Sequence, residues 1–184
     1  HLRQEVTTVK VFIAGAKDIR TVDVNAKKRI ESICSKEYDI LVGDCYGVDS
    51  AVQKLCADAS YRHVTVYASN GKPRNNIGHW PVKSIPVPST VRGFDYYRQK
   101  DVAMSMDADF GYMIWDRQSK GTLCNIISLI SQGKCTVVYL APVAKTICLQ
   151  SQEDLLQLIS ACPTETQNLF DKLEMHIAQD SLFA

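Results

Sequence analysis

The sequence predicts an α/β fold, a Rossmann-like three-layer sandwich with a mostly parallel sheet and a helical C-terminal tail. Short apolar runs of strand length alternate along the chain with amphipathic stretches of helix length. The apolar runs are rich in β-branched residues on both faces, which is typical of strands buried inside a parallel sheet. The 184 residues are 46% hydrophobic and 22% charged, which suits one globular domain with its own core.

Six apolar runs are predicted to form the strands of the sheet. In chain order they span residues 9–16, 38–44, 63–69, 83–88, 110–116 and 135–142. The fourth run is short and contains prolines, so it is expected at the periphery of the sheet. The sixth run is expected to be the last strand.

The stretches between and after these runs are predicted to form helices. Four of them span about 23–37, 48–59, 94–108 and 122–133, the last one stopped by Gly133. Two amphipathic helices form the tail, the first opening with a capping-box-like SQED sequence at Ser151 and the second beginning near Thr164. We expect one domain over residues 1–184, with a core at about 9–142 and C-terminal helices at about 151–180.

Composition narrows the classes of function. A net charge of +1 gives no overall field that would attract nucleic acid, so a nucleic-acid partner is disfavoured. The seven cysteines are odd in number and form no CxxC or zinc-finger spacing, so reduced thiols, no metal site and no cofactor are expected. No apolar run approaches membrane-spanning length and no signal peptide is visible, so we expect a cytoplasmic protein without a membrane partner.

The predicted ligand site lies beyond the carboxyl ends of the strands, where open parallel sheets bind their ligands at the topological switch point. The loops after the first, second and fifth strands and the segment after the fourth should share this edge. The ligand-binding residues expected there are Gly15, Ala16, Lys17, Gly43, Asp44, Gly47, Asp49, Arg98, Lys100, Asp116, Ser119, Lys120, Gly121 and Thr122.

The loop after the second strand reads VGDCYGVD, in which Gly43 and Gly47 bracket the turn into a helix. Glycines let a backbone approach a ligand closely, and the free N–H groups of a helix start face an anion. Asp49 lies in the first helical turn, as the helix dipole favours. A plain tight turn with an acidic first-turn residue explains the same pattern equally well.

The stretch from Asp116 to Thr122 gives a stronger indication of a phosphate or ribose site. Ser119, Gly121 and Thr122 offer small donors and bare amides at a helix N-terminus beside Lys120, while the Asp116 carboxylate suits a pair of ribose hydroxyls. One helix end contributes only about 0.3–2 kcal/mol, whereas micromolar binding needs about 8 kcal/mol, so other contacts must add to it. The alternative is that Ser119 and Thr122 cap the helix, and we expect capping and binding together.

Basic residues concentrate in RGFDYYRQKD, where Arg98 and Lys100 would hold phosphate and a tyrosine would stack on a base. The alternative is a solvated helix face with core-facing tyrosines. The polar loop at 70–81 contains Arg74 and Asn75 and is interpreted as a solvent loop in preference to a lid over the site.

At these loops the sequence resembles the SLOG superfamily, Rossmann-like proteins that include lonely-guy enzymes and relatives of DNA-processing protein A. It is most similar to the YspA-like bacterial members. The resemblance runs from about residue 9 to residue 140 and rests on VFIAGA, VGDCYGVDSAV, KDVAMSMDADFGYMIWD, the S-x-GT turn and GKCTVVYL. It implies a nucleotide or nucleotide-derived small molecule as the ligand, and a homodimer.

Two departures from the family pattern bear on enzyme activity. Lonely-guy phosphoribohydrolases carry a catalytic glutamate shortly after the Gly-Thr pair, whereas this chain has LCNII with Asn125, which cannot transfer a proton. A positioned acid or base contributes roughly 10²–10⁴-fold in rate. Lys100 stands where those enzymes have an arginine, so a bidentate phosphate contact is lost.

The sequence therefore favours a binding or sensing domain and leaves enzyme activity open. The alternative is an N-glycosidic-bond hydrolase or transferase of the phosphoribohydrolase or deoxyribosyltransferase type, with Asp116, Asp44 or Asp101 as the catalytic candidate. The apolar face of the last helix, which carries Leu169, Phe170, Leu173 and Ile177, would serve a dimer or pack on the chain's own sheet.

Overall fold

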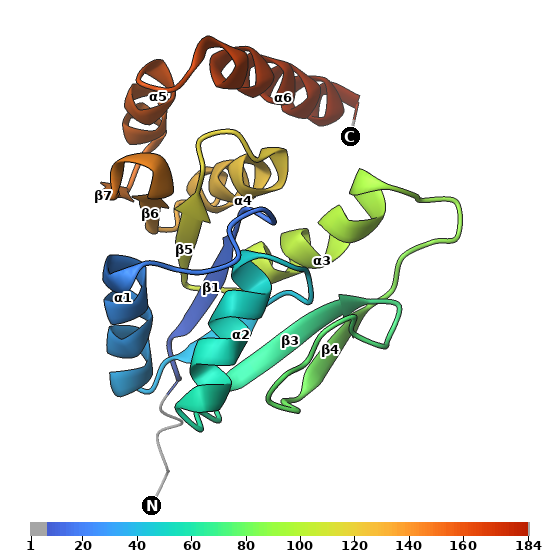
Figure 1. Ribbon diagram of the computed structural model, residues 1–184. Helices are drawn as coiled ribbons and strands as arrows, with labels where there is room; N and C mark the ends of the chain where they lie inside the picture. Colours follow the sequence, from blue (N-terminus) through green and yellow to red (C-terminus); the bar gives the residue numbers. More distant parts are fainter. Residues whose placement is uncertain (1–6, 184) are drawn as a thin grey trace, which may run out of the picture.

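The computed structural model describes residues 7–183, with the side chains of residue 178 and residues 180–183 outside the description. Its centre is a seven-stranded sheet in the order β4-β3-β2-β1-β5-β6-β7 (Figure 1). The strands are β1 (Lys10–Gly15), β2 (Asp39–Val42), β3 (Val64–Ser69), β4 (Val82–Ile85), β5 (Phe110–Trp115), β6 (Thr136–Leu140) and β7 (Lys145–Leu149). All neighbours pair in parallel except β6 and β7, which are antiparallel.

Helices cover both faces of the sheet, which confirms the predicted Rossmann-like sandwich (Figure 1). They are α1 (Val24–Ser35), α2 (Val48–Asp58), α3 (Phe94–Asp107), α4 (Lys120–Ser131), α5 (Gln152–Ser160) and α6 (Thr164–Phe183), with a 3₁₀ turn η1 (Ala141–Val143). The first two helices pack on one face, and α3 and α4 pack on the other together with the tail helices α5 and α6.

Alternation along β1 explains why the apolar runs form strands here. Val11 and Ile13 are buried in the cluster under α1 and α2, while Phe12 and Ala14 are buried in the cluster under α3 and α4. Because successive side chains of a strand point to opposite faces, a strand covered by helices on both sides must be apolar throughout. As the prolines predicted, β4 lies at one edge of the sheet.

The strand predicted at residues 135–142 is present as β6, but it is not the last strand, because the chain turns back at η1 and adds β7 antiparallel to β6. The reversal ends at Ala144, which has a left-handed backbone with φ of 50°. Glycine and asparagine are the residues that signal such a turn in a sequence, and an alanine there gives no signal.

The start of the helix predicted at 122–133 also needs correction. The structure begins α4 at Lys120 with Ser119 in the N-cap position, so Gly121 and Thr122 belong to its first turn. The expectation of side-chain capping is likewise not met at Ser119, whose side chain makes no capping hydrogen bond.

The apolar face of α6 packs on the chain's own core over its first half. Phe170 is buried there, and Leu169 and Leu173 are partly buried against the same cluster. Ile177, one turn further on, is 49% exposed. Intramolecular packing therefore uses most of the face that would otherwise serve a homodimer.

Gly121, inside α4, and Gly133, just after its C-terminus, should respond in opposite ways to replacement by alanine. A Cβ would meet nothing within 4 Å at Gly133 and nothing closer than 4.0 Å at Gly121, so neither substitution is crowded. Gly133 has φ of 72°, where alanine costs about 1 kcal/mol, whereas Gly121 is helical and alanine gains about 0.5–1 kcal/mol. Urea unfolding of both variants tests this, and a shift of the same sign in the two would contradict it.

No helix within residues 7–183 combines the length and the apolar character that crossing a membrane requires.

Candidate ligand-binding site

The topological switch point lies between β1 and β5. The chain builds the sheet outward from β1 to β4 and then returns to place β5 on the other side of β1, with Gly15 paired to Ile114 at their carboxyl ends. The loop after β1 leads to a helix on one face and the loop after β5 to a helix on the other, so they diverge here. Open α/β sheets bind ligands at such a divergence.

The loops after β1 and β2 pack against each other through glycines. At Gly47, which has φ of 77°, a Cβ would lie 2.3 Å from the Lys17 carbonyl oxygen, and at Gly15 it would lie 2.3 Å from the Ile114 carbonyl oxygen. The Val48 amide donates to the Ala16 carbonyl at 3.3 Å. These two glycines are therefore needed because other protein atoms pack where a Cβ would lie. The sequence had suggested a different role, in which they let the backbone approach a ligand.

A charged cluster lies beyond the end of β2, in which Asp44, Asp49 and Lys100 are buried, Asp101 is half-buried and Arg74 is exposed. The Asp44 carboxylate accepts from the Arg74 amide and from its guanidinium, each at 2.8 Å. The Lys100 ammonium donates to Asp101 at 2.9 Å and approaches to 3.3 Å from where a Gly43 Cβ would stand. Asp49 accepts from the Cys45 amide at 3.1 Å.

The pKa values in this cluster follow from burial and from these neighbours. Burial raises the pKa of Asp49 to about 7, although the nearby Lys100 opposes the rise. Burial also tends to raise the pKa of Asp44, but the hydrogen bonds that Asp44 accepts from Arg74 outweigh burial and lower its pKa. Burial lowers the pKa of Lys100, but Asp101 and Asp49 outweigh that effect and raise it. Near neutral pH the cluster therefore has one carboxyl group, Asp49, that is ready to exchange a proton.

The loop between β3 and β4 is attached to this cluster, contrary to its interpretation as a solvent loop. Besides the contacts of Arg74 with Asp44, the side chain of Gln53 bridges Gly43, Asn75 and Ile77, with distances of 2.9 to 3.2 Å. The Arg74 guanidinium also lies 4.3 Å from the centre of the Tyr97 ring. Sequence reasoning left Arg74 out of the site, and only its place after a strand end pointed to it.

The turn into α4 forms the second part of the site. One oxygen of Asp116 accepts from the amides of Gln118 at 2.9 Å and Ser119 at 2.7 Å. Thr122 is buried and donates to the Ser119 hydroxyl at 3.2 Å. A Cβ on Gly121 would find its nearest neighbour, an atom of Phe94, 4.0 Å away. In contrast to Gly15 and Gly47, Gly121 faces open space.

Exposed aromatic rings border this edge of the sheet. Phe94 is 41% exposed and has the Lys120 ammonium 4.2 Å from its ring centre, and Tyr97 is 43% exposed beside Arg74. Tyr46, in the loop after β2, is 73% exposed. Cations placed over aromatic faces are favourable, and exposed rings beside them are suitable platforms for a nucleobase.

Arg98 lies apart from the other predicted residues. Its guanidinium donates to Asn125 at 2.5 Å, to Ser128 at 2.6 Å and to the Cys124 carbonyl at 3.1 Å, which fixes it along α4. The same contact explains Asn125, which is buried as the acceptor of this guanidinium. Of the remaining predicted residues, Gly15 to Lys17 join the loop after β2, and Asp116 to Thr122 form the start of α4.

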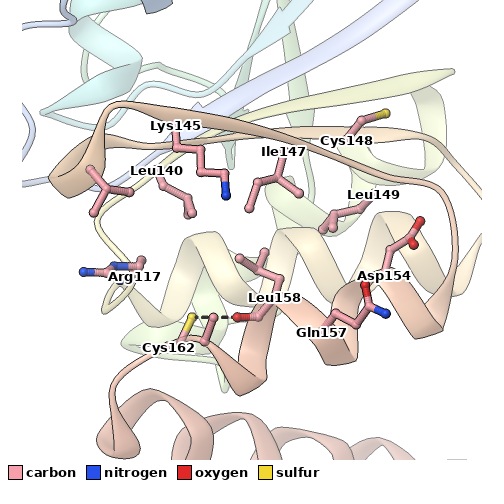
Figure 2. Close-up of a pocket in the computed structure, with 12 residues that line it drawn as sticks. Arg117, Leu140, Lys145, Ile147, Cys148, Leu149, Asp154, Gln157, Leu158 and Cys162 are labelled. Carbon is pink, nitrogen blue, oxygen red and sulfur yellow. Dashed lines mark hydrogen bonds between the residues drawn. The ribbon is translucent and has the colours of Figure 1, made fainter.

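A cavity of about 530 Å³ lies away from this edge, between β7 and α5 (Figure 2). Among the described residues, no group of three or more histidine, cysteine, aspartate and glutamate side chains could hold a metal ion.

Comparisons with known proteins give similarity in fold. Neither a protein-family model nor a curated protein sequence matches the chain. A solved structure of DNA processing protein A from Helicobacter pylori, described for its unique single-stranded DNA binding mode, matches with a TM-score of 0.59. It is 13% identical, and the match covers 92% of this chain and 82% of that one. At this identity the similarity shows a shared Rossmann-like fold.

Proposed function

We propose that the chain binds a nucleotide or nucleotide-derived small molecule at the strand edge between β1 and β5, as a SLOG-type domain related to the YspA-like members. The observation that carries this proposal is the open N-terminus of α4. It has no side-chain cap at Ser119, open space at Gly121, and Lys120 and Phe94 beside it. Free amides at a helix start, a cation and an exposed ring match the phosphate and base of a nucleotide.

In this proposal three contacts share the binding free energy. The helix end contributes up to about 2 kcal/mol towards the phosphate, and stacking of the base on Phe94 or Tyr97 contributes about 1–3 kcal/mol. Asp116 holds a ribose hydroxyl through the carboxylate oxygen that does not accept from Gln118 and Ser119. The sum reaches roughly micromolar affinity only with further contacts from the loop after β1, which contains the exposed Lys17.

We further propose that the ligand is bound without efficient turnover. Each catalytic candidate from the sequence already has a partner: Asp44 pairs with Arg74, Asp101 with Lys100, and Asp116 accepts two amides. If the chain is an N-glycosidase, Asp49 is the better candidate, because a pKa of about 7 suits a general acid or base. Accumulation of a free base that stops in an Asp49→Asn variant would replace the binding proposal with this one.

The proposal is tested by equilibrium dialysis against AMP, ADP-ribose and NAD, with both chambers analysed by chromatography. We expect one of them to be enriched intact, and Gly121→Glu to weaken its binding about 30-fold because a carboxylate then occupies the phosphate position. Gly121→Ala is the matched control, expected to bind within about threefold of the wild type because its methyl group meets open space. Equal binding by all three proteins would reject the site.

Single-stranded nucleic acid is a second candidate, favoured by the exposed rings at this edge and by the single-stranded DNA binding described for the structure of similar fold. Its test is fluorescence anisotropy with a labelled oligothymidylate over a range of salt concentrations. Binding tighter than that of any mononucleotide, with an affinity that falls steeply as salt increases, would favour this candidate.

A further inference from the structure

The cavity between β7 and α5 has the size and lining of a small-molecule site. Ligand pockets typically measure about 300–1,000 Å³ and are mostly apolar with a few polar groups. In Figure 2 Leu140, Ile147 and Leu149 extend from the strands towards Leu158, which rises from α5. The apolar lining is completed by Val143, Ala161 and Cys162.

The polar groups of this cavity leave an excess of positive charge. Arg117 and Lys145 both line it, and neither forms an ion pair or a side-chain hydrogen bond among the described residues. The Nε atom of Arg117 is fully buried and is the single such side-chain atom in that part of the chain without a hydrogen-bond partner. The Asp154 carboxylate already has a hydrogen-bond partner, since it accepts from the Gln150 amide at 2.8 Å.

The backbone holds Arg117 in this position. The residue has a left-handed conformation with φ of 66°, which is uncommon for a side chain of this size. The hydroxyl of Thr166, a buried residue of α6, donates to the Arg117 carbonyl. A buried donor without a partner is unfavourable, so a strained residue that keeps one beside a cavity requires an explanation.

We propose that this cavity binds a small amphipathic anion, a carboxylate carried on an apolar chain. The apolar walls cover the chain, while the Arg117 guanidinium and the Lys145 ammonium hold the carboxylate. The site is distinct from the nucleotide site, although Arg117 directly follows Asp116 in the loop between β5 and α4.

Isothermal titration of the whole chain with decanoate tests this site. Decanol, which lacks the carboxylate, and acetate, which lacks the long apolar chain, are the comparison probes. We expect decanoate to bind at least tenfold more tightly than either. Arg117→Gln and Lys145→Gln should each weaken decanoate about tenfold, as the loss of a charged hydrogen bond does. Leu158→Trp, which fills the cavity, should abolish binding.

Ala161→Leu fills the same space with a smaller change and replaces Leu158→Trp if that variant does not fold. Equal affinity for decanoate and decanol would overturn the assignment of the anion. No decanoate binding by the folded wild-type chain, or unchanged binding by the cavity-filling variant, would overturn the site itself.

A different observation concerns two cysteines on the opposite face of the same strand pair. The Sγ atoms of Cys135 and Cys148 lie 3.5 Å apart. Cys148 pairs with Val137 across β6 and β7, and Cys135 lies two residues before Val137, so both thiols are on one face. Cys148 borders the cavity, but in Figure 2 its sulfur points away from Leu158, and the residue is exposed.

We infer that these two thiols form a reversible disulfide with a small disulfide such as oxidised glutathione. The Cys148 thiolate attacks the glutathione disulfide and releases one reduced glutathione. The Cys135 thiolate then attacks the sulfur of Cys148 and releases the second. The two protons lost by the cysteine thiols pass through solvent to the two released glutathione sulfurs, and the two electrons removed from the cysteine pair reduce one glutathione disulfide to two thiols.

Tryptic peptide mapping after incubation with oxidised glutathione tests the pair directly. Cleavage after Lys134, Lys145 and Lys172 puts Cys135 in peptide 135–145 and Cys148 in peptide 146–172, which also contains Cys162. We expect the two peptides to be linked and to separate on reduction. Cys148→Ser should abolish the link, while Cys162→Ser, the matched control, should retain it.

A stable glutathione adduct at Cys148 without the linked peptides would overturn the inference, because the second thiol would then not reach the first. Loss of the link in Cys162→Ser would also overturn it, since the disulfide would involve the wrong residue.

Discussion

Replacing Asp49 with asparagine is expected to stabilise the chain at about pH 8 and to have little effect at about pH 5. Burial raises the pKa of Asp49 from its usual 3.8 to about 7, so the folded state keeps a proton that the unfolded state has already lost. The contribution of this group to stability therefore falls as pH rises from about 4 to about 7. At roughly 1.4 kcal/mol per pKa unit, the wild type loses up to about 4 kcal/mol across this range.

Urea unfolding at several pH values measures this difference. Asparagine keeps an oxygen to accept from the Cys45 amide, so the variant resembles the protonated wild type. Asp58→Asn is the control, since Asp58 is exposed and, among the described residues, its carboxylate forms an ion pair with Lys54 alone, at 3.4 Å. A stability difference between Asp49→Asn and the wild type that is constant with pH would contradict the raised pKa.

Gly47→Ala is expected to lower the free energy of unfolding by about 3 kcal/mol or more. The residue has φ of 77° and ψ of −129°, a region that is essentially restricted to glycine. A Cβ would also lie between 2.3 and 2.5 Å from three backbone atoms of Lys17. Because those atoms belong to the main chain of the loop after β1, relief would require that loop to move.

Gly71→Ala separates the effect of the positive φ from the effect of the crowding by backbone atoms. Gly71 has φ of 102°, but its Cβ would meet only the Ser84 hydroxyl oxygen at 3.9 Å, so its substitution tests conformation without crowding. We expect it to cost about 1–2 kcal/mol in urea unfolding. Equal losses in the two variants would mean that the loops after β1 and β2 are not packed as described.

The fold was predictable because its signals are local. Strand and helix patterns, the prolines at β4 and the glycine after α4 can each be read from a few neighbouring residues. The strand β7 was missed because its reversal ends at Ala144, a residue type that carries no turn signal.

The site was less predictable because its contacts join distant parts of the chain. Arg74 donates a hydrogen bond to Asp44, 30 residues away in the sequence, and Arg98 donates one to Asn125, 27 residues away. A sequence shows that an arginine is present, but the partner that fixes it depends on tertiary packing. The glycines illustrate the same limit, since the sequence alone shows neither the positive φ and close neighbours of Gly47 nor the helical backbone and open space of Gly121.

The central claim is that the ligand lies between the loop after β1 and the start of α4. Backbone amide shifts of the ¹⁵N-labelled chain, titrated with ADP-ribose, test it most directly. We expect the largest changes at the amides of Ala16, Lys17, Gly121 and Thr122. Changes confined to the cavity between β7 and α5, or no changes up to about millimolar ligand, would contradict it.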